Sequence, residues 1–165
     1  VSSTADASGE SWQAIEEVIS VNLLASMATV QAVVPAMRRR NGGGQVALIS
    51  SLAAWYGLPV TPAYSASKAG IKNYGEALRV ALAEDGIEVS VVLPGFVSSA
   101  MSRTVPGPKP FLMNAERAAE LIVKGLARRK ARISFPFPLN LGCWLLALLP
   151  ASISGWLVRK FGYHA

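Results

Sequence analysis

The sequence predicts an α/β domain in which two parallel strands are joined through a helix. Residues 45–50 and residues 87–93 are short apolar runs of strand length, and each follows a glycine. Between them, residues 62–84 repeat apolar positions at spacings of three and four, which is typical of an amphipathic helix. Pro62 suits the first turn of that helix, where a missing N–H costs nothing. A right-handed β-α-β crossover is therefore expected.

Composition indicates one apolar domain without a metal site. The chain has 165 residues, enough to bury a core, and is 52% hydrophobic but only 16% charged. Cys143 is the single cysteine, so neither a disulfide framework nor a cysteine zinc site is expected. His164 is the single histidine and stands next to the C-terminus, which argues against histidine catalysis.

The net charge of +6 is concentrated toward the C-terminus. Glu120 is the last acidic residue, and seven cations follow it: Lys124, Arg128, Arg129, Lys130, Arg132, Arg159 and Lys160. A basic tail without a recognition fold is weak evidence for a nucleic-acid partner. We expect no nucleic acid, and a membrane surface is the better alternative.

Ser51, Tyr64 and Lys68 form the candidate catalytic group. Ser51 directly follows the first predicted strand, at the carboxyl end where open parallel sheets bind ligands. Tyr64 and Lys68 are four residues apart on one face of the predicted helix. A lysine ammonium one turn away favours the phenolate and so lowers the pKa of the tyrosine. A serine hydroxyl aimed at the same point can hold a substrate oxygen while its charge changes.

This group contains no strong nucleophile and no metal ligand, so it fits hydride transfer to an external carrier better than hydrolysis. Tyr-x-x-x-Lys alone is a weak signal, because such pairs arise by chance on solvated helix faces. The full string is stronger: ISS at residues 49–51 and YSASK at residues 64–68 closely resemble the active-site segment of the short-chain dehydrogenase/reductase family. The resemblance implies a Rossmann-like, doubly wound parallel sheet.

The resemblance also implies an activity and a role for each residue. It implies NAD- or NADP-dependent interconversion of a carbonyl and an alcohol, with Tyr64 as the acid/base. Lys68 would hold the cofactor ribose and tune Tyr64, and Ser51 would orient the substrate oxygen. Ser50 is the alternative to Ser51, but the family spacing favours Ser51. The family packs the helix of residues 62–84, and the one before it, against a second subunit, so a homo-oligomer is implied.

Asn22 lies within a helix that we expect to begin after Ser11, which can cap it, and to continue toward Met37. An asparagine inside a helical pattern is more often a kink or a local backbone partner than a catalytic residue. The resemblance changes that weighting, because the family carries an asparagine in a V-N-L context. There it helps to hold a water that relays protons to Lys68.

Pro94, Gly95, Val97 and Ser99 follow the second predicted strand, at the same carboxyl edge. A Pro-Gly turn is nonspecific by itself. In this position it resembles the family motif whose following loop contacts the nicotinamide. Val97 would lie near the carboxamide. Ser99 stands where the family often has threonine and keeps the hydroxyl.

No glycine-rich dinucleotide fingerprint precedes Ser51. The resemblance then implies that residues 1–165 are one incomplete domain, the C-terminal portion of a longer protein. The alternative functions are a truncated, non-catalytic fragment and a membrane-associated reductase of a lipid-like ketone. The sequence does not distinguish NAD from NADP.

The remaining segments leave alternatives open. Residues 96–113, rich in proline and apolar side chains, form either a lid over an apolar substrate or an ordinary surface connection. A capped helix is expected over residues 114–130. Residues 133–158 carry no charge. We expect an edge strand at residues 133–135 with the rest packed over the substrate pocket, ahead of peripheral membrane attachment and of a full span. The expected location is cytoplasmic, with the membrane periphery as alternative.

Overall fold

The structure, a computed structural model, describes residues 1–4, 9–40 and 43–163. Its centre is a parallel sheet of three strands in the order β1-β2-β3, comprising Gly44–Ile49, Ile87–Pro94 and Arg132–Phe135. Val46 pairs with Val89, and Val92 pairs with Ile133. The predicted α/β class and the edge strand at residues 133–135 are confirmed. His164 lies outside the described residues.

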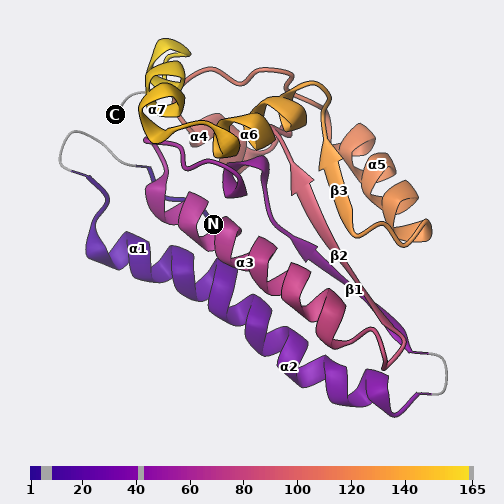
Figure 1. The fold of residues 1–165 in the computed structure, drawn as a ribbon. Coiled ribbons are helices and arrows are strands. Elements are labelled where there is room, and N and C mark those ends of the chain that lie inside the picture. The colour runs from indigo at the N-terminus through magenta and orange to yellow at the C-terminus, as the bar shows by residue number, and fades with distance from the viewer. Residues whose placement is uncertain (5–8, 41–42, 164–165) are drawn as a thin grey trace.

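One face of the sheet is covered by a long N-terminal helix and by α3 (Figure 1). The long helix consists of α1 (Trp12–Val18), a π-helical turn (Ile19–Leu24) and α2 (Ala25–Arg38), and α3 spans Pro62–Ala81. Ser11 caps the first of these as expected, since its Oγ accepts a hydrogen bond of 3.2 Å from Ala14 N–H. The π-helical turn was not expected, because the sequence pattern is uniform across it.

The long helix Trp12–Arg38 meets the length and hydropathy of a membrane span, the only helix of the described part to do so. It nevertheless packs on the domain. Val30 and Val34 of α2 join Ile71 of α3 and Val46 and Val89 of the sheet in one buried cluster. An apolar helix that covers a sheet passes the same length and hydropathy test.

The opposite face of the sheet carries α5 (Ala115–Ala127), capped by Asn114 as predicted, with the Asn114 side chain accepting from Arg117 N–H at 2.9 Å. Ala118 packs there against Val92 and Ile133. Both helices end three residues earlier than we expected. α5 ends at Ala127 where residue 130 was expected, and α3 ends at Ala81 where residue 84 was expected. In α3 the reason is that Leu82 leaves helical geometry and enters the core, where it is 3% exposed.

The C-terminal third lies at the carboxyl ends of the strands as two short helices, α6 (Leu139–Leu148) and α7 (Ala151–Lys160) (Figure 1). Prolines separate them from β3 and from each other: Pro136 and Pro138 before α6, and Pro150 before α7. Each helix has 10 residues, half of the roughly 20 that a spanning helix needs. Residues 133–158 therefore form no continuous membrane span.

An ionic cluster joins α3 to β3. Lys72 and Arg132 contact the Glu76 carboxylate at 3.0 and 2.7 Å, and both cations lie over the Trp55 ring. Burial alone would raise the pKa of Glu76, but hydrogen bonds and charges from the two cations outweigh it and lower that pKa.

Candidate active site

Ser51 stands at the point where β1 ends and a short 3₁₀ helix, Leu52–Ala54, begins. It caps that helix, because its Oγ accepts a hydrogen bond of 3.2 Å from Ala53 N–H. The same Oγ lies 3.5 Å from the Pro94 carbonyl oxygen at the end of β2. The Ser51 hydroxyl is thus held at the carboxyl edge of the sheet, between two strand ends.

Ser50, the alternative to Ser51, has a different place. Its hydroxyl donates a hydrogen bond of 2.7 Å to the Lys68 backbone carbonyl, and its side chain is buried. Ser50 thereby fastens the end of β1 to α3. Its hydroxyl is occupied, whereas that of Ser51 faces the tyrosine described next.

Tyr64 and Lys68 lie in the first two turns of α3, beside Ser51. The Lys68 ammonium nitrogen is 5.5 Å from the centre of the Tyr64 ring and donates a hydrogen bond of 3.0 Å to the Ile49 carbonyl. We expected the Lys68 ammonium to lower the pKa of Tyr64, and that expectation is wrong for this structure: burial raises the pKa of Tyr64, and a hydrogen bond with the Ser51 side chain only partly opposes that rise. Burial also lowers the pKa of Lys68. The sequence spacing predicted that Ser51, Tyr64 and Lys68 form one group, and the three side chains do lie together in the folded structure.

These pKa directions indicate the starting proton state. A tyrosine whose pKa lies above its usual value of about 10 is protonated at neutral pH. Tyr64 is therefore placed to donate a proton to an oxygen held by Ser51. The Lys68 ammonium next to it stabilises the phenolate that remains after the transfer.

Asn22 occupies the π-helical turn, and its side chain is buried. Its amide Nδ2 donates to Ser67 Oγ at 3.1 Å, which links the long helix to α3 one residue before Lys68. Its backbone carbonyl accepts from Ser26 Oγ at 2.6 Å, and its side chain also bonds Val1. π-turns occur often at functional sites, since they re-aim a side chain and free backbone groups.

Asn22 and Lys68 line one open cavity of about 340 Å³ between the long helix and the free edge of β1. No direct hydrogen bond joins the two residues in the described part of the chain. The expected relay through a water therefore stays a prediction. Ser67, which sequence reasoning missed, is the direct partner of Asn22, and its only signal was its place inside the YSASK string.

The loop after β2 holds the remaining predicted residues. Gly95 N–H donates to the Phe135 carbonyl at 2.8 Å, and a Cβ on Gly95 would lie 2.9 Å from Pro136 Cδ, so only glycine fits. Val97 pairs with Met113 in an isolated parallel bridge. Pro94 reaches Ser51, as described above, whereas Val97 also packs against the buried cluster of Val92, Ala118, Ile133 and Phe135 on the α5 side of the sheet.

Ser99 caps a helix that the sequence did not predict, α4 (Ala100–Thr104). The caps are reciprocal, because Ser99 Oγ accepts from Ser102 N–H at 3.1 Å and Ser102 Oγ accepts from Ser99 N–H at 2.9 Å. Farther on, the Tyr163 hydroxyl donates to the Pro108 carbonyl at 2.7 Å. The segment of residues 96–113 is thus fastened at Met113 and at Pro108, and whether it moves as a lid stays a prediction.

The C-terminal helices contact the same edge of the sheet. Leu139 and Cys143 of α6 pack against Leu52 and Leu93, and Val158 of α7 packs against Val60. Burial raises the pKa of the Cys143 thiol to about 11. One side of each helix therefore covers the region next to Ser51.

The sequence model of the short chain dehydrogenase family matches residues 1–109, well over half of the chain. The chain belongs to the short-chain dehydrogenase family. An uncharacterized oxidoreductase of Myxococcus xanthus is 39% identical over 97% of this chain. Ketoacyl reductase HetN of Nostoc is 32% identical over 72% of it. The chain spans only 63% of the Myxococcus protein and 42% of the Nostoc protein.

Solved structures agree with the fold of this short-chain dehydrogenase. A short chain dehydrogenase of Burkholderia cenocepacia in complex with NADP superposes with a TM-score of 0.77 at 23% identity, covering 96% of this chain and 65% of that one. A short-chain dehydrogenase of Sphingobium yanoikuyae in complex with NADPH gives a TM-score of 0.75 at 22% identity, covering 84% and 54%. The Rossmann-like fold prediction is confirmed.

Proposed function

We propose that this short-chain dehydrogenase is an NAD- or NADP-dependent oxidoreductase that interconverts a carbonyl and an alcohol. The observation that carries the proposal is the grouping of Ser51, Tyr64 and Lys68 at the carboxyl edge of the sheet. Family membership and the NADP and NADPH complexes of similar folds support it.

The residues present fit a nicotinamide cofactor. The Lys68 ammonium and the Tyr64 hydroxyl would hold the ribose, and the loop Pro94–Gly95 with Val97 and Ser99 would lie along the nicotinamide. Gly95 lets this loop lie close to the segment after β3 and to α6, since an added Cβ would come within 2.9 Å of Pro136 Cδ and 3.2 Å of Leu139 Cδ2. The bound cofactor supplies or accepts the hydride.

The protein's own groups would handle the proton. The Ser51 hydroxyl hydrogen-bonds the substrate oxygen and keeps it within reach of the Tyr64 hydroxyl. During reduction, Tyr64 gives its proton to that oxygen; during oxidation, it takes the proton back. The Lys68 ammonium stabilises the phenolate and passes a proton back to it, and Asn22 supports the return of a proton to Lys68.

An apolar substrate is the proposed class. The surroundings of Ser51 support it: Leu139, Tyr56 and Phe96 are partly buried apolar or aromatic side chains, packed over the buried clusters of Leu52 and Val60. A site with few polar groups beyond the catalytic ones binds apolar ligands best.

The proposed assembly is a homo-oligomer in the cytoplasm, formed through the outer faces of α2 and α3. Small or apolar side chains are exposed there at helical spacings: Leu24, Ala28, Ala32 and Pro35 on the long helix, and Ala66, Asn73, Ala77 and Val80 on α3. Small side chains let the helices of two copies approach closely.

The deciding experiment is calorimetric binding of NADP and NAD to the protein, followed by reduction of an apolar aryl ketone. We expect Lys68→Ala to weaken cofactor binding. Tyr64→Phe should spare binding but lower turnover by about 10²- to 10⁴-fold, because it removes the acid/base.

The rival function, a non-catalytic fragment, is favoured by the chain's span of 63% of the Myxococcus protein. Absence of cofactor binding by the unmutated protein would support that rival. Unchanged turnover in Tyr64→Phe would overturn the assigned roles even if the cofactor binds.

A further inference from the structure

The outward side of α6 is an unbroken apolar face. Leu141, Trp144, Leu145 and Leu148 follow one another at spacings of three, one and three, so they share one side of the helix. Each is between 41% and 63% exposed. Large apolar side chains that are exposed singly are ordinary, but four on one helix face are not.

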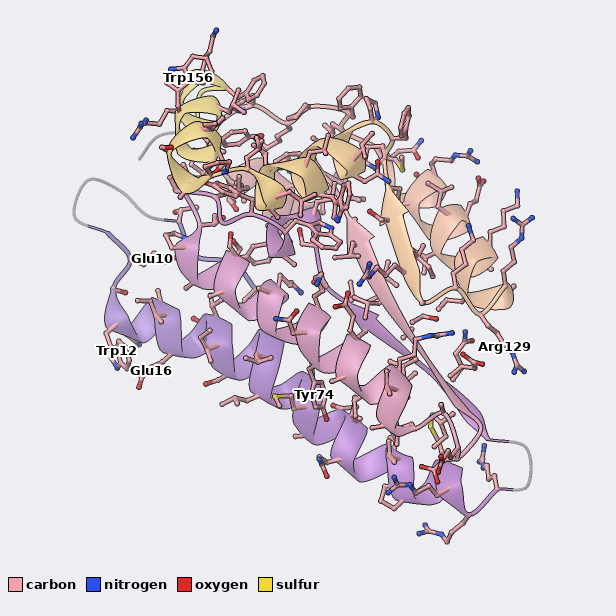
Figure 2. The ribbon with its side chains drawn as sticks, viewed as in Figure 1. Glu10, Trp12, Glu16, Tyr74, Arg129 and Trp156 are labelled. Atoms are coloured by element: carbon pink, nitrogen blue, oxygen red, sulfur yellow. The ribbon has the colours of Figure 1, made fainter. Side chains whose placement is uncertain are left out.

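α7 extends this surface. Ile153, Trp156 and Phe161, in α7 or at its end, are 47% to 63% exposed. Figure 2 shows Trp156 at the outer tip of the molecule, pointing away from the sheet. We name these seven exposed residues the α6–α7 patch: Leu141, Trp144, Leu145, Leu148, Ile153, Trp156 and Phe161.

The two helices are fixed to the domain by their other sides. Leu139 and Cys143 contact the cluster around Leu52, and Val158 is 4% exposed against Val60. The α6–α7 patch is therefore what remains outside after the helices have packed. One side of the helices packs on the domain, and among the described residues the large apolar side chains of the other side stay 41% to 63% exposed.

Both charged side chains of α7 are positive. Arg159 and Lys160 stand exposed at the end of α7, and the Lys160 ammonium lies 4.9 Å over the Trp156 ring. No acidic side chain follows Glu120 in the sequence. The other basic run, around Arg129, lies on the other side of the molecule from Trp156 in Figure 2. The sequence pattern of cations on both sides of residues 133–158 is therefore not reproduced in space.

We propose that the α6–α7 patch docks on the surface of an anionic lipid bilayer. The leucines and Phe161 enter the boundary of the acyl chains, the two tryptophans lie at the headgroup level, and Arg159 and Lys160 contact lipid phosphates. Helices of 10 residues lie in that interface and do not cross it. The proposal goes beyond the oxidoreductase function and stands without it.

A second copy of the chain is the competing occupant, and charge disfavours it. A two-fold interface brings the same patch of both copies together. Arg159 and Lys160 would then face their own counterparts, with no acidic side chain among residues 121–163 to neutralise them. An anionic bilayer supplies that neutralisation.

The test is flotation of the protein with vesicles of phosphatidylcholine alone and of equimolar phosphatidylcholine and phosphatidylserine. We expect flotation with the anionic vesicles, falling as salt is raised. The double variant Trp144→Ser/Leu148→Ser should lower the bound fraction more than 10-fold. Val123→Ser is its matched control, because Val123 is 66% exposed on α5, away from the patch.

A second pair of variants tests the charges. Arg159→Glu/Lys160→Glu should weaken anionic binding on the order of 10-fold or more, from about fivefold per cation near such a surface. Arg128→Glu/Lys130→Glu makes the same charge change just after α5 and should have little effect on vesicle binding. Absence of flotation with anionic vesicles overturns the proposal, and so does flotation that the patch variants do not change. A concentration-dependent dimer, seen by light scattering and lost in Trp144→Ser/Leu148→Ser without vesicle binding, would assign the patch to a second copy instead.

Discussion

Burial of the Lys68 ammonium lowers the stability of the folded protein, but it places the group beside Tyr64 in the candidate active site. It is partly buried, and burial lowers its pKa, while among the described residues the Ile49 carbonyl is its one direct hydrogen-bond partner. The folded protein therefore holds this proton less tightly than the unfolded chain. Such a compromise is typical of a functional site.

We expect Lys68→Met to raise the free energy of unfolding at pH 7 and to lower turnover at least 100-fold. In the unmutated protein, the unfolded state binds more protons between the lowered pKa and 10.5, so stability rises with pH in that window. The stability advantage of the variant should shrink as pH rises toward 10.5. Urea unfolding of both proteins at several pH values measures this, and a constant difference would contradict it.

The packing of α3 on the sheet depends on Gly75. A Cβ at this position would lie 2.6 Å from Val91 Cγ2 and 2.9 Å from Leu48 Cδ1. The close approach keeps α3 against β1 and β2, and so keeps Tyr64 and Lys68 at the ends of these strands. A helix that moved outward would separate them from Ser51.

Gly75→Ala should therefore destabilise the protein by about 1 to 3 kcal/mol, because overpacking outweighs the better helix propensity of alanine. Gly142→Ala is the matched control, since Gly142 lies inside α6 with nothing within 4 Å of an added Cβ. That change should stabilise by about 0.5 to 1 kcal/mol. Thermal unfolding compares the two variants, and effects of the same sign would refute the close-packing argument.

Two exposed apolar surfaces in the part of the chain that the structure describes differ in the size of their side chains. The outer face of α2 and α3 is built of small side chains and lies along the long axis of the helices, whereas the α6–α7 patch is built of large ones at the carboxyl end of the sheet. We assign the first to a second subunit and the second to lipid. One variant at each surface separates the two assignments.

Val80→Arg should shift the proposed oligomer to monomer, because Val80 is 80% exposed on the outer face of α3 and an arginine there would be buried without a partner. Val123→Arg on α5 introduces the same charge elsewhere and should leave the mass unchanged. Light scattering coupled to gel filtration measures the molar mass of both variants. A monomeric unmutated protein would remove the oligomer from the proposal.

Local features of the chain could be predicted because their causes are local. Ser11 and Asn114 cap helices whatever the rest of the chain does. The i, i+4 spacing of Tyr64 and Lys68 puts them on one face of any helix. Strand–helix–strand order makes the sheet parallel and brings Ser51 to its carboxyl edge.

Contacts between distant segments were decided only by the folded structure. The sequence shows Asn22 inside a helical pattern, but not the π-turn or the Ser67 hydroxyl that its amide binds. The pKa directions of Tyr64 and Lys68 come from burial, which depends on every element around them. Residues 133–158 carry no polar face, so no periodicity could tell which side of α6 and α7 would pack. Packing chose that side, because only the assembled core has a surface for Leu139 and Val158 to cover, and the leucines and tryptophans opposite them remain in solvent.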